Sequence, residues 1–206
     1  MRDNGSKTHW DNVYNTRGDN EVGWYQDTPV TSLQLIEELR LGLNDSVIDV
    51  GGGNSNLIFE LTGLGFSNLT VLDISSSALN RTKKKMGSLA SRVTWVVSDI
   101  LDYESYNEYE LIHDRAAFHF LTNPDDVERY AKWAMDSTKM GGYIIISTFS
   151  LSGPKRCSNL DIVQYSAKSL EKVFRKGFKL VKTMDTVHIT PFNSTQNFVF
   201  CVFKRV

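Results

Sequence analysis

Residues 47–55, with the sequence VIDVGGGNS, constrain the fold of this chain more than any other stretch. A four-residue segment that reads as a buried strand and contains one acid runs directly into three glycines. A helix is expected to follow over residues 56–64. Glycines let the backbone come close to a ligand without a Cβ in the way, and the helix offers unpaired N–H groups at its first turn. The stretch predicts a nucleotide site at the carboxyl edge of an open α/β sheet.

The bulk composition fits a single globular domain over residues 1–206. A chain of 206 residues can bury a full core, and its net charge of −1 gives no global field to attract nucleic acid or an anionic membrane. The two cysteines, Cys157 and Cys201, are far apart, which argues against a disulfide framework and against a structural metal site. Because no secretory signal and no membrane-length apolar run is found, we expect a cytoplasmic protein without a membrane partner.

Strand-like and helix-like segments alternate along most of the chain. The expected strands cover residues 46–50, 68–72, 93–97, 109–113, 143–149, 179–188 and 197–204. Five βα units followed by a β-hairpin predict an α/β fold, with a parallel sheet that contains one antiparallel strand and has helices on both faces.

Two segments fall outside this alternation. Residues 1–30 carry Trp10, Tyr14 and Trp24, whose aromatic rings either pack on the core or form a lid over the glycine-rich turn. Aromatic faces suit a lid because they can cover an adenosine or a sulfonium cation. Residues 150–165 show little periodicity, and we expect them to form a loop on the substrate side.

Acids end four successive predicted strands: Asp49, Asp73, Asp99 and Asp114. Ligands of open α/β sheets bind beyond the carboxyl ends of the strands, so these carboxylates are candidates for ligand contacts. Asp49 can brace the turn or face an ammonium group, Asp73 can accept ribose hydroxyls, and Asp99 can accept from an adenine amino group. Asp114 is a candidate for structural or amine-binding work. The alternative for each is a helix N-cap directly after a strand.

A dinucleotide is the competing ligand for such a turn. Its fingerprint, G-x-G-x-x-G, is met by Gly51 and Gly53 but has Asn56 at the third position. Asp49, two residues before Gly51, also favours a ligand with an amine over an anionic pyrophosphate. Ribose, adenine and a cationic amino-acid end are together the chemistry of S-adenosylmethionine.

These residues resemble the class I S-adenosylmethionine-dependent methyltransferases. The resemblance covers about residues 45–150 by motif, and it implies a three-layer Rossmann-like fold whose seven strands lie in the order 3-2-1-4-5-7-6, with the last strand antiparallel. It also implies S-adenosyl-L-homocysteine as product. A Gly-Gly turn before the fifth strand, Gly141-Gly142, fits the same family. The implied cofactor-binding residues are Trp10, Tyr14, Trp24, Asp49, Gly51, Gly52, Gly53, Ser55, Asp73, Ile74, Asp99, Ile100 and Asp114.

Within this class, the stretch from Asp114 to Ala117 resembles the Asp-Arg-Gly-Ala stretch of thiopurine methyltransferase-like enzymes. The acceptor is therefore expected beyond the fourth strand, with Arg115 as first candidate to contact it; a salt bridge between Arg115 and a neighbouring acid is the alternative. His119 and His188 are candidate bases, each with core packing as the alternative. His113, inside the fourth strand, is expected to be a core histidine near the cofactor.

The sequence predicts a methyltransferase that acts on a small-molecule acceptor by in-line displacement. A protein lysine methyltransferase and a cofactor-binding protein without turnover are the alternatives. The acceptor, the methylated atom and the oligomeric state stay open at this point, and no nucleic-acid partner is expected.

Overall fold

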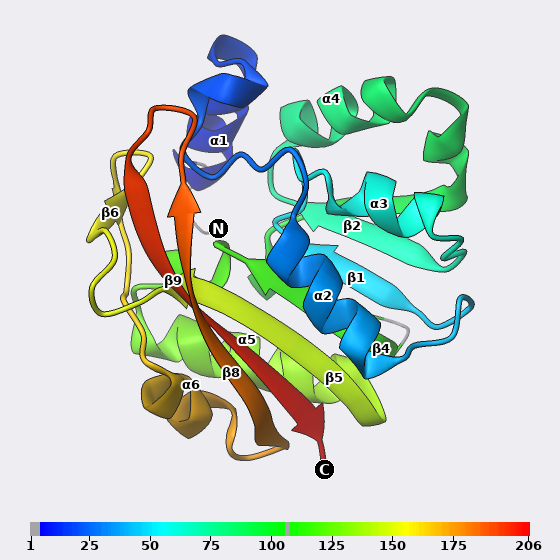
Figure 1. Cartoon of the computed structure of the whole chain (residues 1–206), viewed down its shortest axis with the longest axis vertical. Helices are drawn as coiled ribbons and strands as arrows, with labels where there is room; N and C mark the ends of the chain where they lie inside the picture. The colour runs from blue at the N-terminus through cyan, green and yellow to red at the C-terminus, as the bar shows by residue number, and fades with distance from the viewer. Residues whose placement is uncertain (1–4, 106–107) are drawn as a thin grey trace.

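The computed structural model describes residues 5–105 and 108–206, and a seven-stranded sheet forms its centre (Figure 1). The first four residues of the predicted lid lie outside the described residues. The strands of the sheet are β1 (Val47–Val50), β2 (Leu69–Asp73), β3 (Val93–Val97), β4 (Tyr109–Arg115), β5 (Thr138–Phe149), β8 (Phe178–Ile189) and β9 (Thr195–Arg205). A separate small hairpin is formed by β6 (Arg156–Cys157) and β7 (Leu160–Asp161).

Across the sheet the strands lie in the order β3-β2-β1-β4-β5-β9-β8. Strands β1 to β5 are parallel, and β9 is antiparallel to both of its neighbours, β5 and β8. When the small hairpin is left out of the numbering, this is the predicted order 3-2-1-4-5-7-6, so the prediction of a Rossmann-like α/β fold is confirmed. Strands β2 and β3 are added on one side of β1, and β4 and β5 on the other, so the order of strand addition reverses between β1 and β4. Ligands of open α/β sheets bind at such a switch point.

Helices cover both faces of the sheet. The helices α2 (Val30–Leu39), α3 (Leu57–Gly63) and α4 (Ser76–Met86) contribute to a core cluster on one face. The helices α5 (Pro124–Ser137) and α6 (Ala167–Phe174) contribute to a second cluster on the other face. Neighbouring strand residues alternate between the clusters, as in β1, where Val47 packs in the first and Ile48 in the second. Three layers result, as predicted.

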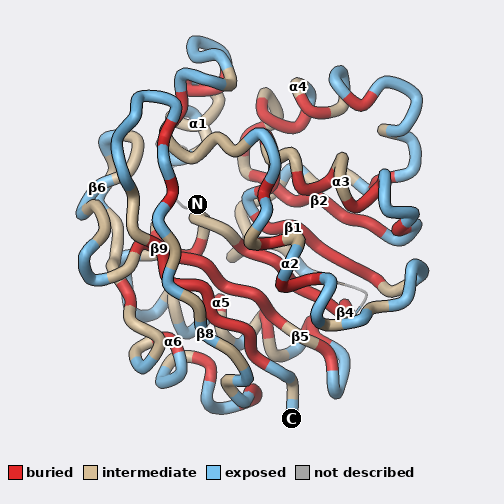
Figure 2. Tube along the Cα trace, in the orientation of Figure 1, coloured by how far each residue is buried: buried red, intermediate tan, exposed pale blue. Residues whose placement is uncertain are grey.

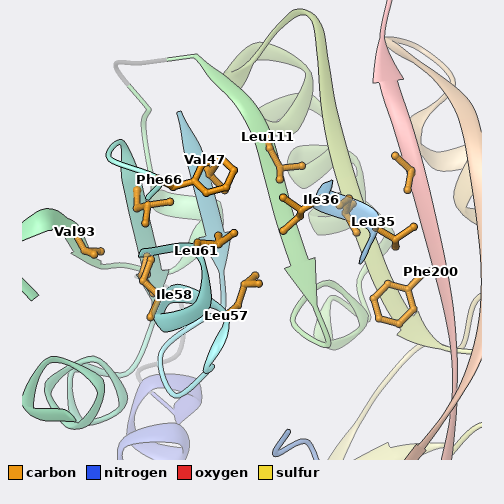
Figure 3. Close-up of a cluster of buried hydrophobic side chains, with 14 of the residues drawn as sticks. Leu35, Ile36, Val47, Leu57, Ile58, Leu61, Phe66, Val93, Leu111 and Phe200 are labelled. Atoms are coloured by element: carbon orange, nitrogen blue, oxygen red, sulfur yellow. The ribbon is translucent and has the colours of Figure 1, made fainter. Parts of the chain in front are cut away.

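Large apolar side chains fill both clusters. Figure 3 shows the first cluster, in which Leu35 and Ile36 of α2 and Leu57 of α3 face the strands. In the second cluster Phe118, Phe174 and Phe203 are fully buried. Each such side chain stabilises the fold by about 1.5–3 kcal/mol relative to an exposed position. Figure 2 shows the buried residues concentrated along the strands and on the inner sides of the helices.

The structure differs from the sequence prediction in two connections. Strand β5 begins at Thr138, before the Gly141-Gly142 turn, because Tyr109 pairs with Thr138 ahead of a register shift to Leu111 and Tyr143. Residues 150–165 are not only a loop, because they include the small hairpin β6–β7. Among residues 5–105 and 108–206, no helix has the length and apolar character that crossing a membrane requires.

Candidate functional site

The glycine-rich turn after β1 is packed so closely that side chains are excluded at each of its three glycines. A Cβ on Gly51, which has φ +69°, would lie 2.6 Å from the Cβ of Ala117. A Cβ on Gly52 would lie 2.2 Å from Asp49 Oδ2, and one on Gly53 would lie 2.6 Å from Ala78 Cβ and from Asp73 Oδ2. The turn therefore brings bare backbone against two of the predicted acids.

Asp49 lies within β1 and is 4% exposed. Its Oδ1 lies 2.7 Å from Nδ1 of His113, and Nε2 of His113 lies 2.9 Å from Oγ of Ser32. Its Oδ2 is buried and has no hydrogen-bond partner among the residues that the structure describes. The prediction of His113 as a satisfied core histidine is confirmed, and Asp49 keeps one free acceptor next to the glycine turn.

Asp73, at the end of β2, is held by two backbone donors. Gly53 N donates to Oδ2 at 3.0 Å and Ser75 N donates to Oδ1 at 2.8 Å. Burial raises the pKa of this carboxyl to about 6. Asp73 lines a cavity at the carboxyl ends of β1 to β4, the main cavity of the site. Both oxygens keep further lone pairs, so the carboxylate can accept from two neighbouring hydroxyls.

Asp99 follows β3 and has two roles. Its side chain accepts from Leu101 N at 2.9 Å, so it caps the 3₁₀ turn η3 (Ile100–Asp102), as the alternative interpretation expected. It also lines the main cavity together with Ile74 and Ile100. A carboxylate beside two apolar side chains is suited to an adenine ring that donates through its amino group.

The main cavity has a volume of about 190 Å³ and lies at the carboxyl ends of β1 to β4. Residues from α1 (Gly5–Thr16), the strand ends and the small hairpin line it. The lining residues are Ser6, Trp10, Tyr14, Trp24, Val50, Gly51, Leu72, Asp73, Ile74, Ser98, Asp99, Ile100, Arg115, Ala116, Ala117, Phe120, Leu121 and Cys157.

A smaller cavity of about 40 Å³ adjoins it at the glycine turn and shares Tyr14, Trp24, Gly51 and Arg115 with it. Its other lining residues are Tyr25, Gln26, Pro29, Ser32, Asp49, Gly52, Asn54, Ser55, Asn56 and His113. Asp49, whose Oδ2 has no hydrogen-bond partner among the described residues, is therefore one of the residues around this smaller cavity.

Aromatic side chains from residues 1–30 cover the main cavity. The ring of Trp10 lies 5.6 Å from that of Trp24 and 5.1 Å from that of Phe120, both edge to face. Tyr14 is 7% exposed and lies 6.1 Å from Trp24. Of the two interpretations of this segment, the structure favours the lid, because all three predicted aromatics line the cavity.

Polar contacts attach this lid to the rest of the site. Asp11 Oδ1 accepts from Ser75 Oγ at 2.7 Å and from Ser77 N at 3.2 Å, at the start of α4. Asp19 pairs with Arg81 of α4 and accepts from Asn54 of the glycine turn. The lid is thus tied to the same helix start that follows Asp73.

Four predicted site residues line neither cavity: Gly53, which supports Asp73 through its backbone N–H, together with Asp114, His119 and His188. Asp114 is fully buried; its carboxylate accepts from Ala117 N, Phe118 N and Tyr130 Oη. The structure therefore gives Asp114 a capping role, in place of the predicted contact with the cofactor.

The two predicted bases, His119 and His188, also make packing or bracing contacts in place of the predicted catalytic role. His119 is fully buried, accepts from Phe149 N at 3.4 Å and stacks on Phe149, and burial lowers its pKa to about 3. His188 donates from Nε2 to Gly23 O at 2.9 Å and so braces the lid from β8. Neither imidazole lines a cavity, because each side chain is directed into packing contacts.

Arg115, at the end of β4, lines both cavities as predicted. Its Nη1 donates to Trp24 O at 3.0 Å, and its guanidinium lies 5.0 Å from the ring of Phe198. The alternative interpretation, a salt bridge between Arg115 and a neighbouring acid such as Asp114, does not occur within the described residues, since Asp114 is engaged elsewhere. Burial lowers the pKa of Arg115 to about 10, so it remains a cation at neutral pH.

Sequence reasoning missed several residues of the lining. Phe120 follows β4 on the turn η4 (Phe118–Phe120), and Cys157 reaches the cavity from the small hairpin. Asn54 and Asn56 tie the glycine turn to the lid through Asp19 and Gln26. An aromatic residue shortly after a predicted strand end is a signal that could have found Phe120. No local signal in the sequence marks Cys157, because its position depends on a long-range contact.

In the part of the chain that the structure describes, no three metal-binding side chains are grouped to hold a metal ion. The site consists of an aromatic roof, three carboxylates that line the two cavities, and one cation beside the glycine turn.

A family model described as a methyltransferase domain matches residues 47–142, which run from β1 through β4 into the Gly-Gly turn. The chain carries a methyltransferase domain. It is an S-adenosylmethionine-dependent methyltransferase, as the sequence motifs predicted, and its fold is that of the class I enzymes.

Known proteins resemble this methyltransferase over most of its length. EEF1A lysine methyltransferase 2 of Danio rerio is 25% identical over 98% of this chain and 87% of that protein. Malonyl-[acyl-carrier protein] O-methyltransferase 2 of Ilyobacter polytropus is 28% identical over 61% of this chain and 49% of that protein. The N-methyltransferase NodS of Bradyrhizobium japonicum, solved with S-adenosyl-L-homocysteine, has a TM-score of 0.66 at 15% identity, covering 98% of this chain and 99% of that one.

The residues of this methyltransferase fit S-adenosylmethionine. Asp99 with Ile74 and Ile100 suits the adenine, Asp73 suits the ribose hydroxyls, and the orphaned Oδ2 of Asp49 suits the ammonium. A buried carboxylate oxygen without a partner is a costly feature in a folded protein, and a ligand ammonium would satisfy it. The glycines let the turn pack directly against Asp49 and Asp73, so both carboxylates are held beside the turn.

The pKa of Asp73 gives a testable pH dependence. A charged carboxylate accepts from hydroxyls more strongly than a neutral carboxyl, so cofactor binding favours the deprotonated form. Since the pKa of Asp73 is about 6, affinity for S-adenosyl-L-homocysteine should decrease as the pH falls through that value. We expect binding up to about tenfold weaker at about pH 5 than at about pH 7.5. Calorimetric titration measures this, and the same slope in Asp73→Asn would contradict the assignment.

Proposed function

We propose that this methyltransferase transfers its methyl group to a small-molecule acceptor that carries an anionic group. The observation that carries the proposal is Arg115, a cation in the cavity wall whose guanidinium forms no ion pair within the described residues. A guanidinium has five N–H donors, and one of them is used by Trp24 O. The remaining donors favour a carboxylate or a similar anion, which a guanidinium binds through paired hydrogen bonds.

The aromatic roof of the site supports a compact acceptor. The ring of Trp10 contacts the rings of Trp24 and Phe120 beside the main cavity. When bound, S-adenosylmethionine supplies a methyl group that its sulfonium already activates. The chain then has to align the acceptor and exclude water, and the aromatic roof does both.

The acceptor side of the described lining offers no ready base. His119 and His188 lie outside the cavities, and burial raises the pKa of Cys157 to about 12, so its thiol is not ionised at neutral pH. We therefore propose that the acceptor atom arrives without its proton, or loses it to solvent, while Arg115 holds the anionic group.

A protein lysine acceptor is the second candidate, favoured by the similarity to EEF1A lysine methyltransferase 2 over nearly the whole chain. Two assays separate the candidates: methyl transfer to a panel of small carboxylates, thiols and amines, and labelling of a proteome with radioactive S-adenosylmethionine. Turnover on anionic panel members supports the first candidate. Labelled proteins together with an inactive panel would favour the second.

Replacing Arg115 tests the anion contact. We expect Arg115→Leu to lower kcat/KM for the best anionic acceptor of the panel by about 100-fold, because two charge-assisted hydrogen bonds are lost. Arg115→Lys keeps the charge but not the paired geometry, so its kcat/KM should lie between those of the unmodified protein and of Arg115→Leu. The Kd of S-adenosyl-L-homocysteine, measured by calorimetry, should change less than about threefold.

Arg156 provides the matched control, because its side chain is 64% exposed on the small hairpin and pairs with Asp161. Arg156→Leu removes the same charge close to the site and should leave kcat/KM unchanged. If Arg115→Leu retains the activity of Arg156→Leu on every anionic acceptor, the proposal of an anionic acceptor is wrong.

A further inference from the structure

We propose that His113 and Ser32 are positioning residues for the ammonium group of the cofactor. In this inference they fix the orientation of the Asp49 carboxylate so that its Oδ2 is presented to the smaller cavity. The inference rests on S-adenosylmethionine as cofactor, and it does not depend on which acceptor is methylated.

The three side chains form a continuous hydrogen-bonded chain from three elements. Ser32 lies in α2, His113 in β4 and Asp49 in β1, where Asp49 and His113 are paired across the parallel strands. The distances are 2.9 Å from Ser32 Oγ to His113 Nε2 and 2.7 Å from His113 Nδ1 to Asp49 Oδ1. All three residues line the smaller cavity, and each is at least nine-tenths buried.

The chemistry of this chain sets the direction of its hydrogen bonds. A carboxylate only accepts, so Nδ1–H of His113 donates to Asp49, and in the neutral imidazole Nε2 then accepts from the Ser32 hydroxyl. Asp49 therefore selects the imidazole tautomer, and the Ser32 hydroxyl donates to the remaining nitrogen, Nε2, and fixes the ring orientation. This leaves Asp49 with one satisfied oxygen and one free oxygen, the second being the orphaned Oδ2.

Electrostatics explains why a buried carboxylate at this position needs such a donor. Burial disfavours the charged form of an acid, and a hydrogen bond donated to the carboxylate restores it. A neutral imidazole supplies the donor without adding a positive charge beside a ligand that already carries an ammonium and, before transfer, a sulfonium. His113 thus meets a need that a lysine or arginine in the same place would not meet.

The arrangement resembles the order of groups in a serine hydrolase triad, but its setting differs. Ser32 is 1% exposed and faces only the smaller cavity, whose volume is about 40 Å³. A substrate carbonyl has no room to approach Oγ there, so nucleophilic attack by Ser32 is excluded by access. The free atom of the chain is instead the carboxylate oxygen at its other end.

Two ligands distinguish positioning of the ammonium from general support of the fold. S-adenosyl-L-homocysteine carries the amino-acid end, whereas 5′-methylthioadenosine carries the adenosine and sulfur without it. We expect His113→Phe to weaken S-adenosyl-L-homocysteine by about 30-fold, because Asp49 loses its donor, and to change 5′-methylthioadenosine by less than about threefold. Calorimetric titration of the full-length chain with each compound gives both values.

Two milder variants keep the test decisive if His113→Phe does not fold. Asparagine places its amide nitrogen near the position of Nδ1, so His113→Asn should retain affinity for S-adenosyl-L-homocysteine within about fivefold. Ser32→Ala removes only the hydrogen bond that orients the His113 ring, and it should weaken the binding of S-adenosyl-L-homocysteine by about threefold to tenfold, again without an effect on 5′-methylthioadenosine.

The outcomes separate cleanly. A selective loss of S-adenosyl-L-homocysteine affinity in His113→Phe or Ser32→Ala supports the positioning role. An equal loss for both ligands, or no loss for either, overturns it. Failure of the unmodified protein to bind S-adenosyl-L-homocysteine would instead overturn the cofactor assignment itself.

Discussion

Replacing Asp73 with alanine is expected to weaken the binding of S-adenosyl-L-homocysteine by at least about 100-fold. The carboxylate is fixed by Gly53 N and Ser75 N, and it faces the main cavity with both oxygens still able to accept. Two ribose hydroxyls that donate to a buried carboxylate each contribute about 1.5–3 kcal/mol, because hydrogen bonds to charged groups are the strong ones. Asp73→Asn retains the shape but loses the charge, so its affinity should lie between those of the unmodified protein and of Asp73→Ala.

Asp102 is the matched control for this substitution. It lies three residues after Asp99, and its side chain is 61% exposed, at 3.8 Å from Arg129. Asp102→Ala should leave the Kd of S-adenosyl-L-homocysteine within about twofold of the unmodified value, as measured by calorimetry. A circular dichroism melt of each variant checks that the fold is kept. Unchanged affinity in a folded Asp73→Ala variant would show that the ribose is bound elsewhere.

Gly53→Ala is expected to have an effect of similar size through a different cause. The added Cβ would lie 2.6 Å from both Ala78 Cβ and Asp73 Oδ2, and neither atom belongs to a flexible side-chain end. Relief of this contact requires the turn to move away from α4 or the carboxylate to rotate. We expect about 1–3 kcal/mol of lost stability from overpacking and at least about 100-fold weaker binding of S-adenosyl-L-homocysteine.

Gly63→Ala gives a control with the same chemical change. Gly63 ends α3, and a Cβ there would meet nothing within 4 Å. Alanine at a helical position is favoured over glycine by about 0.5–1 kcal/mol, so this variant should melt at the same or a slightly higher temperature. Its cofactor affinity should be unchanged. If Gly53→Ala behaves like Gly63→Ala in both measurements, close packing of the turn does not govern the site.

Much of the sheet was predictable because its signals are local. The apolar runs that became β1 to β5 and the turn between β8 and β9 each follow from neighbouring residues. Acids at strand ends share one edge of a parallel sheet, and Asp49, Asp73 and Asp99 accordingly line two adjoining cavities at this edge. Spacing along the sequence is sufficient to predict that these acids lie at the same edge, because strand direction decides where the carboxyl end of each strand lies.

The side chains after β4 show where sequence reasoning stops. Arg115 and His119 are four residues apart, yet Arg115 lines the cavities while His119 is buried against Phe149. Ala116 has φ +67° and begins the turn that redirects the chain, and this conformation at a non-glycine residue has no clear sequence signal. Asp114 was likewise turned inward by three donors, one of them the distant Tyr130.

The acceptor side was the least predictable part, because distant segments build it. Cys157 of the small hairpin and Trp10 of α1 meet in the lining of one cavity, although they are far apart in the chain. The hairpin has strands of two residues, too short for any periodic pattern. His188 contacts Gly23 of the lid and the ring of Phe198, which also contacts Arg115.

A crystal structure with S-adenosyl-L-homocysteine tests the central claim most directly. We expect the ligand ammonium at hydrogen-bond distance, about 2.7–3.2 Å, from Asp49 Oδ2. We also expect the ribose hydroxyls on Asp73, the adenine beside Asp99, and the sulfur facing the space that Arg115 and Phe120 line. An amino-acid end bound away from Asp49, or a sulfur directed away from Arg115, would contradict the account.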